Sequence, residues 1–271
     1  MRQLVLPNGK EIYYIDELTA LDVYREIFKE NIYFKHDIEI KNGDIVFDVG
    51  ANIGLFSLYI ADLVSDLNIY AFEPVEPIFK ILKANVADLS CNITTYNIGL
   101  SKKDETIEFF YYPKVSADSA AVQFDWDYKV EKYVENYKEA VCKNIPIARI
   151  VPKFLRKRVV RAGLKRMYQS EKIQCRLRSL SDIIREEKIE QIDFLKIDAE
   201  NFEKQVIAGI EDDHWNLINQ IAMEVHEHIK SGKNLLNKFI KLLENKSFNV
   251  KVGEEDIFAK LGVYMLYATK N

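Results

Sequence analysis

Paired cysteines, long apolar runs and a marked excess of one charge are all missing from this sequence of 271 residues. Cys91, Cys142 and Cys175 are far apart and form no C-x-x-C motif, which argues against a disulfide framework and a zinc site. No stretch approaches the roughly 20 apolar residues that a membrane-spanning helix needs, and residues 1–10 lack the apolar core of a signal peptide. We therefore expect a reducing, cytoplasmic location.

The composition is that of a folded protein without an obvious polyanionic partner. The chain has 38 Lys and Arg against 42 Asp and Glu, a net charge of -4, so the molecule as a whole does not indicate nucleic-acid binding. With 48% hydrophobic and 30% charged residues, most of the length is expected to be ordered. We expect an N-terminal cap over residues 1–40 and a main domain over 41–271, with a helical insertion at about 124–170.

The first part of the chain predicts a cap followed by βαβ units. Pro7-Asn8-Gly9 suits the turn of a short hairpin, and a helix is expected over residues 16–29. From Asp44 onward, short apolar runs alternate with amphipathic stretches, which is the pattern of a mostly parallel sheet. The expected strands here are 45–49, 68–73 and 93–98, and the expected helices are 52–63 and 78–87.

The second part interrupts this alternation and then resumes it. An aromatic-rich strand at 106–112 is expected at an edge or in a small insertion, and the amphipathic stretch 124–170 is broken by Pro146 and Pro152. The later strands are expected at 174–178, 193–197 and 218–225, and the later helices at 180–187, 202–208 and 234–244. Two final strands, 247–252 and 262–268, have no predicted helix between them, which implies an antiparallel partner at the end of the sheet. The predicted fold class is therefore α/β, Rossmann-like, with one antiparallel strand near the C-terminus.

A glycine loop, Asp48-Val-Gly-Ala-Asn-Ile-Gly54, follows the first expected strand. Ligands bind at the carboxyl ends of strands in open α/β sheets, and Gly50 and Gly54 let the backbone approach them closely. The loop lacks the G-x-G-x-x-G spacing of a dinucleotide site, and Asp48 would repel a pyrophosphate, whereas a sulfonium cofactor that carries an amino acid tolerates it. Glu73 ends the second strand, where it can accept hydrogen bonds from both hydroxyls of an adenosine ribose, although Glu73-Pro74 also serves as a strand terminator. We expect S-adenosylmethionine (SAM) to be bound by these residues: Asp48, Gly50, Ala51, Asn52, Gly54, Glu73, Pro74, Gly99 and Asp198.

Two later strand ends, Lys196-Ile-Asp-Ala-Glu200 and Glu224-Val-His-Glu-His228, carry acidic and imidazole groups. Methyl transfer needs an aligned nucleophile and a base to remove its proton. His226 is the candidate base, and Glu224, on the same face of the strand, is the candidate group that orients it. Asp198 is the third candidate catalytic residue. The alternative is that His226 and His228 are exposed strand-end residues and that Asp198 caps a helix. The same groups suit a divalent cation, but we favour a site without metal.

These stretches resemble the FkbM-type methyltransferase family. The resemblance rests on Asp48 to Gly54, Ala71-Phe-Glu-Pro74, Leu195-Lys-Ile-Asp-Ala-Glu200 and Glu224-Val-His226, in that order, and extends from about Tyr33 to the C-terminus. Asn201 stands where the family commonly has glycine. The resemblance implies SAM-dependent methyl transfer.

Further stretches look like those of family members associated with polyketide and nonribosomal peptide assembly. This resemblance is carried by Tyr33-Phe-Lys-His36, residues 192–198, His214-Trp215 and residues 262–268. It implies O-methylation of a hydroxyl on a natural-product intermediate, free or bound to a carrier protein, and makes His36 a candidate for the lid side of the pocket. The alternatives are a sugar hydroxyl of a glycan as acceptor, a non-catalytic cofactor-binding interaction module, and an NAD-linked oxidoreductase.

Residues 143–170 contain nine basic side chains and no acidic one. The nine are Lys143, Arg149, Lys153, Arg156, Lys157, Arg158, Arg161, Lys165 and Arg166. Four interpretations compete: a docking surface for an acidic carrier protein, a clamp on phosphate in the substrate or its pantetheine arm, a nucleic-acid contact, and a solvated helix pair. We rank the carrier or phosphate first, because the overall acidity and the lack of an RNA-binding motif disfavour nucleic acid.

Overall fold

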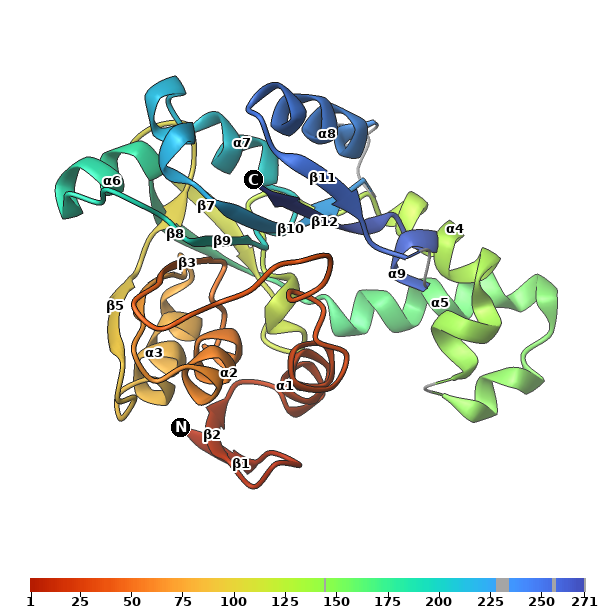
Figure 1. Ribbon diagram of the computed structural model, residues 1–271. Helices are drawn as coiled ribbons and strands as arrows, with labels where there is room; N and C mark the ends of the chain where they lie inside the picture. Colours follow the sequence, from red (N-terminus) through yellow and green to blue (C-terminus); the bar gives the residue numbers. More distant parts are fainter. Residues whose placement is uncertain (144, 228–233, 255–256, 271) are drawn as a thin grey trace.

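A seven-stranded sheet lies at the centre of the computed structural model, which describes residues 1–143, 145–227, 234–254 and 257–270 (Figure 1). The strands, in spatial order, are β11 (Asn249–Val252), β12 (Val263–Thr269), β10 (Gln220–His226), β9 (Phe194–Ile197), β3 (Ile45–Val49), β4 (Asn68–Phe72) and β5 (Asn92–Tyr96). Neighbouring strands are parallel except at β12, which runs antiparallel to both β10 and β11. The predicted Rossmann-like sheet with one antiparallel strand near the C-terminus is confirmed.

Helices cover both faces of this sheet, so its inner strands are buried on both sides and are apolar on both faces. On one face lie α2 (Leu55–Leu63) and α3 (Glu76–Asn85), and on the other lie α6 (Leu180–Glu187), α7 (Glu203–Ala208) and α8 (Leu235–Asn245) (Figure 1). Within β3, Val46 packs in the core beneath the first pair and Phe47 in the core beneath the second set. Because β3, β4, β9 and β10 are parallel, their carboxyl ends lie at the same edge of the sheet.

A second sheet of three strands stands beside the first. It contains β6 (Gly99–Leu100), β7 (Glu105–Tyr111) and β8 (Glu171–Arg178), in which β8 pairs antiparallel with β7 and parallel with β6. The strand predicted at 174–178 exists, but its expected place in the main alternation was wrong. An alternating pattern indicates which side chains are buried but not which strand is the partner. Here β8 pairs with β7, across the helical segment that separates them in the chain.

The N-terminal residues form the predicted hairpin and helix. Strands β1 (Arg2–Val5) and β2 (Glu11–Tyr14) pair antiparallel, and α1 (Glu17–Tyr24) continues into a π-helical turn, η1 (Arg25–Lys29). The Asp16 carboxylate accepts a hydrogen bond from the backbone N–H of Thr19 at 2.8 Å, which caps the start of α1. This segment packs in the same core cluster as α2 and α3.

Between β7 and β8 the chain forms a group of helices that extends to one side of the sheet (Figure 1). They are α4 (Trp126–Glu135), the π turn η3 (Lys138–Cys142), the 3-10 turn η4 (Pro146–Ile150) and α5 (Lys153–Met167), with a further 3-10 turn, η2 (Ser116–Asp118), before them. They share an apolar cluster of their own, formed by Val130, Tyr137, Cys142, Ala148, Val160 and Leu164. Pro146 and Pro152 stand at the starts of η4 and α5, where the sequence predicted breaks.

Two smaller elements complete the fold. A 3-10 turn, η5 (Asp212–Leu217), precedes β10, and a single helical turn, α9 (Ile257–Lys260), lies between β11 and β12, so the expectation of no helix there was wrong. One turn is too short to produce the periodic apolar pattern on which helix prediction depends. Cys91, Cys142 and Cys175 are buried and form no disulfide. Among the described residues, no helix combines the length and apolar character needed to cross a membrane.

Candidate active site

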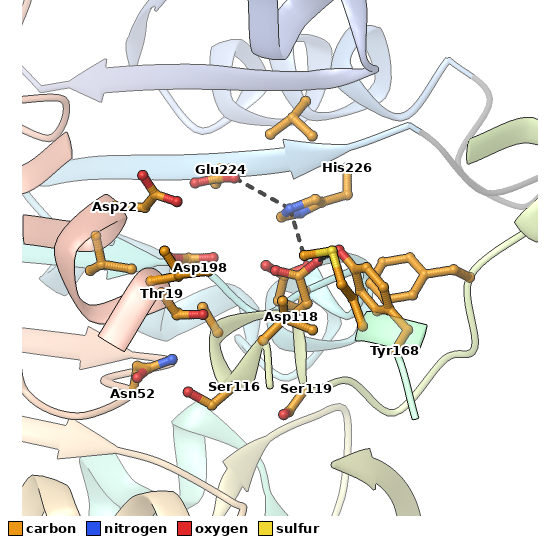
Figure 2. Close-up of a pocket in the computed structure, with 18 of the residues that line it drawn as sticks. Thr19, Asp22, Asn52, Ser116, Asp118, Ser119, Tyr168, Asp198, Glu224 and His226 are labelled. Carbon is orange, nitrogen blue, oxygen red and sulfur yellow. Dashed lines mark hydrogen bonds and ion pairs between the residues drawn. The ribbon is translucent and has the colours of Figure 1, made fainter. Parts of the chain in front are cut away.

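A cavity of about 1030 Å³ opens at the carboxyl ends of β3, β4, β9 and β10. Its walls come from the glycine loop, the strand ends, α1 and the helices α4 and α5. Figure 2 shows Thr19 and Asp22 of α1 near Asp198 and Glu224, with His226 toward Asp118 and Tyr168 on the other side. The volume is at the upper end of the range for small-molecule sites, so the cavity has room for more than one ligand.

The glycine loop is locked against the end of β9. Gly50 has φ +74°, and a Cβ atom at this position would lie 1.8 Å from the backbone carbonyl oxygen of Asp198. The backbone N–H groups of Gly50 and Ala51 both donate to the carbonyl oxygen of Phe72, at 3.1 and 2.9 Å. Glycine is therefore required at position 50 on two grounds, its backbone angle and the space around it.

Most of the residues predicted to bind the cofactor line the cavity: Gly50, Ala51, Asn52, Glu73, Pro74, Gly99 and Asp198. The structure does not bring Asp48 or Gly54 to the cavity surface. Gly54 is the residue before α2, with φ +87°. The Asp48 side chain is fully buried behind the loop, where it accepts a hydrogen bond from the Ser57 hydroxyl at 2.9 Å.

The buried carboxylate of Asp48 is paired with Lys196. The ammonium group of Lys196 lies 3.1 Å from the Asp48 carboxylate and donates to the carbonyl oxygen of Gly50 at 2.8 Å. Burial lowers the pKa of Lys196, but Asp48 and Asp198 outweigh this effect and raise it. A charged lysine therefore ties the glycine loop of β3 to the end of β9.

Glu73 directly follows β4 and lines the cavity. Its two oxygens accept hydrogen bonds from the backbone N–H groups of Asn52, at 3.1 Å, and Val75, at 2.9 Å. Burial raises the pKa of Glu73 to about 7, against the lowering effect of these two N–H groups. Because each carboxylate oxygen has a second lone pair, both can still accept a hydroxyl donor from a ligand.

His226 lies at the centre of a cluster of carboxylates and is 2% exposed. Its Nδ1 is 2.7 Å from Glu203 Oε1, and its Nε2 is 3.5 Å from Glu200. Nε2 also lies 3.3 Å from Glu224, the pair joined by a dashed line in Figure 2. Burial alone would lower the pKa of His226, but Glu200 and Glu203 raise it well above its usual value. The expected contact between His226 and Glu224 is present, but the shortest contact to the imidazole is made by Glu203.

Asp198 borders this cluster on the side of the glycine loop, where Gly50 lies against its backbone. The Tyr33 hydroxyl donates to its carboxylate at 3.0 Å, and burial together with Glu224 raises the pKa of Asp198. Asp198 caps no helix, because α7 begins after Phe202. Single ligand atoms of Asp198, Glu224 and His226 lie within 4.8 Å of one another, so these three residues could hold a metal ion.

A left-handed turn positions Glu203. Glu200 has φ 43° and Asn201 φ 70°. Asparagine tolerates this region better than most residues, so Asn201 makes the turn at the position where the family commonly has glycine. The backbone N–H of Asn201 donates at 2.9 Å to Glu203 Oε1, the same oxygen that contacts His226.

Three residues of this site were missed in the sequence: Glu26, Tyr33 and Glu203. Glu26 comes from the π turn η1 and lines the cavity, and burial together with Glu224 raises its pKa to about 9. Glu26 and Tyr33 both belong to the predicted cap: Glu26 is in no motif, and Tyr33 entered the prediction only as part of the Tyr33–His36 stretch that carries the resemblance. For Glu203, the available signal was the resemblance, because the family pattern commonly has a second glutamate at this position, three residues after Glu200.

The remaining histidine predictions fall outside the cavity or outside the described residues. His36 is exposed, with its ring 5.1 Å from that of Tyr267, and does not line the cavity. His228 lies outside the described residues. The far wall is instead fixed by Lys129, which donates to the Tyr168 hydroxyl at 2.7 Å and lies 3.8 Å from the centre of the Phe124 ring.

The sheet order defines the fold class first, because it is that of the Rossmann-like class I methyltransferases. A solved FkbM methyltransferase from Methylobacillus flagellatus has this fold, with a TM-score of 0.52 and 13% identity over 88% of this chain and 47% of that one. The family model described as the Methyltransferase FkbM domain matches residues 48–250. The chain therefore belongs to the FkbM methyltransferase family, as its motifs predicted.

Relatives of known name support this assignment. The 31-O-demethyl-FK506 methyltransferase FkbM of Streptomyces tacrolimicus is 31% identical over 267 residues, which cover 98% of this chain and 96% of that protein. Methyltransferase sdnD of Sordaria araneosa is 30% identical over 259 residues, which cover 92% of this chain and 89% of that protein. The AMB antimetabolite synthetase AmbE of Pseudomonas aeruginosa is 31% identical over 98% of this chain, which spans 12% of its length. The chain is a SAM-dependent methyltransferase related to enzymes of natural-product biosynthesis.

Proposed function

We propose that the chain transfers the methyl group of SAM to a hydroxyl group of a polyketide or peptide intermediate. The observation that carries the proposal is the continuity of one cavity, which joins Glu73 and the glycine loop to the carboxylate and imidazole cluster around His226. A methyltransferase needs a cofactor site and a proton acceptor that face the same space.

The residues at the inner end of the cavity fit SAM. Gly50, Ala51 and Asn52 present backbone at the end of β3, and Glu73 has lone pairs left for the ribose hydroxyls. Bound SAM supplies an electrophilic methyl group on a positively charged sulfur. The carboxylates of Asp198 and Glu224 face the same cavity and complement that charge.

The proton of the acceptor hydroxyl is proposed to pass to the pair formed by His226 and Glu224. Glu203 holds Nδ1 of the imidazole, so Nε2 is the nitrogen directed at Glu224 and Glu200. Both of these carboxylates line the cavity, where a hydroxyl can reach them. Tyr33 positions Asp198 on the cofactor side through its hydrogen bond.

The walls contributed by the helices after β7 favour an apolar acceptor. Val141, Ile147, Val151, Val160 and Leu164 all line this part of the cavity. A polyketide or acyl chain packs against such side chains, whereas the hydroxyls of a glycan would lose their hydrogen bonds with water there. The cytoplasmic location stays a prediction.

Calorimetric titration tests the cofactor. SAM and S-adenosylhomocysteine are expected to bind and NAD is not, and binding of NAD alone would overturn the proposal. Glu73→Ala is expected to weaken SAM at least tenfold, about 1.4 kcal/mol, because the ribose loses its acceptor. Glu76→Ala is the control, since this carboxylate is 61% exposed on α3 and pairs with Lys80.

Mass spectrometry of products tests the acceptor. A panel of hydroxyacyl thioesters and a parallel panel of free sugars would be incubated with the protein and SAM. We expect a mass gain of one methyl group on a hydroxyacyl compound, with the methyl on oxygen. Methylation of sugars alone would replace the polyketide or peptide acceptor by a glycan acceptor.

A further inference from the structure

Charge is separated between the helical group after β7 and the rest of the molecule. Residues 126–167 contain twelve Lys and Arg against four Asp and Glu, whereas the rest of the chain contains 26 against 38. A positive region on an otherwise negative protein attracts an acidic partner to that region and repels it elsewhere.

Internal ion pairs neutralise part of this positive charge. Lys157 pairs with Glu131 at 3.0 Å and Arg161 with Asp127 at 2.5 Å, and both pairs join α5 to α4. Seven exposed basic side chains of this region form no ion pair within the described part of the chain: Lys138, Lys143, Arg149, Lys153, Arg158, Lys165 and Arg166. Their charge is therefore available to a partner.

The same region exposes an unusual amount of apolar surface. Of the twelve large hydrophobic side chains exposed in the described part of the chain, seven belong to it. They are Ile145, Ile147, Ile150, Phe154, Leu155, Val159 and Met167. All except Phe154 and Leu155 also line the cavity, so they form its mouth. Exposed apolar surface of this extent, with polar residues around it, indicates an interaction site.

We propose that this surface, which we name the docking face (residues 145–167), binds an acidic carrier domain that delivers the acceptor through the cavity mouth on a phosphopantetheine arm. The inference rests on the proposed function for the identity of the acceptor. A carrier with acidic and apolar surface residues matches both properties of the docking face, whereas nucleic acid offers no apolar surface of this kind. An anionic membrane would also face the negatively charged remainder of the chain, which a small carrier avoids.

The synthetase relative is consistent with a tethered partner. The aligned stretch of AmbE accounts for 12% of that protein, so the matched domain there is part of a much longer chain. A covalent link raises the effective concentration of a neighbouring domain and permits a docking face of modest affinity. A separate partner must rely on charge attraction and apolar contact, both of which the docking face provides.

Binding of a labelled carrier tests the proposal without depending on turnover. Fluorescence anisotropy would follow an acidic acyl carrier protein that carries a 3-hydroxyacyl-phosphopantetheine arm. We expect the triple variant Arg149→Glu, Lys153→Glu and Arg158→Glu to weaken binding at least tenfold, and Phe154→Ser, which changes a side chain 82% exposed, about fivefold. Higher salt should weaken the wild-type complex, because charge attraction is screened.

The matched control reverses three exposed lysines elsewhere, Lys83→Glu, Lys102→Glu and Lys204→Glu, and should leave binding within twofold. Equal weakening by both triple variants, or no binding of the wild-type protein, overturns the docking face. Binding to anionic phosphatidylglycerol vesicles that only the first triple variant loses, with carrier binding unchanged, reassigns it to a membrane surface. Titration with SAM separates failure of the docking face from failure of the proposed function. In the first case the wild-type protein and all variants still bind SAM, and in the second the wild-type protein does not bind it.

Discussion

The inner and outer ends of the cavity differ in charge, in burial and in what holds them in place. The inner end is acidic and buried, and its groups contact one another directly, as Glu203, His226 and Glu224 do. The outer end is basic, exposed and apolar, and the helices behind it have an apolar cluster of their own. Under the proposed function, methyl transfer takes place at the buried end, where the backbone is tightly held, and the acceptor is recognised at the exposed end, where side chains can change without disturbing the sheet.

Two glycines give the largest expected contrast between these ends. At Gly50 a Cβ atom would lie 1.8 Å from a backbone oxygen, whereas at Gly163 of α5 it would meet nothing within 4 Å. Gly50→Ala is expected to cost about 3 kcal/mol or more, about 100-fold in SAM affinity. Gly163→Ala should stabilise the protein by about 0.5–1 kcal/mol, because alanine favours the helix. Calorimetry and urea unfolding measure the two effects.

Similar SAM affinities in the two glycine variants would contradict the contrast. That result would mean that the loop of Gly50 can move away from Asp198 at little cost.

Replacement of His226 comes next in size. His226→Asn removes the proposed proton acceptor while keeping a polar side chain, so turnover should fall about 100-fold or more. SAM affinity should stay within threefold, since His226 lies at the acceptor side of the cavity. Rates of S-adenosylhomocysteine release, measured at saturating SAM, give the turnover. Unchanged turnover would remove His226 as the proton acceptor, and an equal loss of SAM affinity would make its role structural.

A change at Glu203 should shift the pH profile. The carboxylates around His226 raise its pKa. The neutral imidazole that accepts a proton therefore forms only at a pH above the usual pKa of histidine, and turnover should rise over that pH range. Glu203→Gln removes one negative charge, lowers the pKa of His226 and should move the rising limb about one unit toward lower pH. Turnover measured from pH 6 to pH 10 tests the sign. Identical profiles would show that another group limits the rate.

Chelation should have the smallest effect. Nδ1 of His226 already contacts Glu203 and Nε2 contacts two further carboxylates, so we expect EDTA to leave turnover within twofold. A tenfold loss that Mg²⁺ restores would instead assign a metal ion to Asp198, Glu224 and His226. The electron paramagnetic resonance spectrum of added Mn²⁺ gives a second readout.

The two ends also differ in how much of them the sequence predicts. At the inner end, apolar strands ending in Asp48, Glu73 and Asp198 identify the sheet and the cofactor loop, because local patterns and strand order are linked. The roles of the individual residues in that loop were harder to predict from the sequence. Only the fold shows that Asp48 points away from the cavity and is paired with Lys196, since a carboxylate at a strand end can point to either side.

The outer end was predicted by composition alone. The sequence shows the basic run, but the ion-pair partners Asp127 and Glu131 lie on another helix, α4. The sequence of neither helix shows that α4 and α5 pack together. The same limit explains Glu26 and Tyr33. They reach the strand ends through the packing of α1 and η1, which depends on contacts between residues far apart in the chain.

The contact between Gly50 and the backbone of Asp198 has a consequence for protein engineering. These two loops come from distant parts of the chain, yet neither can change shape alone, so a chimera that takes its cofactor loop from a relative must take the segment after β9 from the same parent. In the described part of the segment between β7 and β8, Gly163 shows the opposite case, since a Cβ atom there would meet nothing within 4 Å. Under the proposed function, exchange of that segment between relatives is the change expected to alter the acceptor.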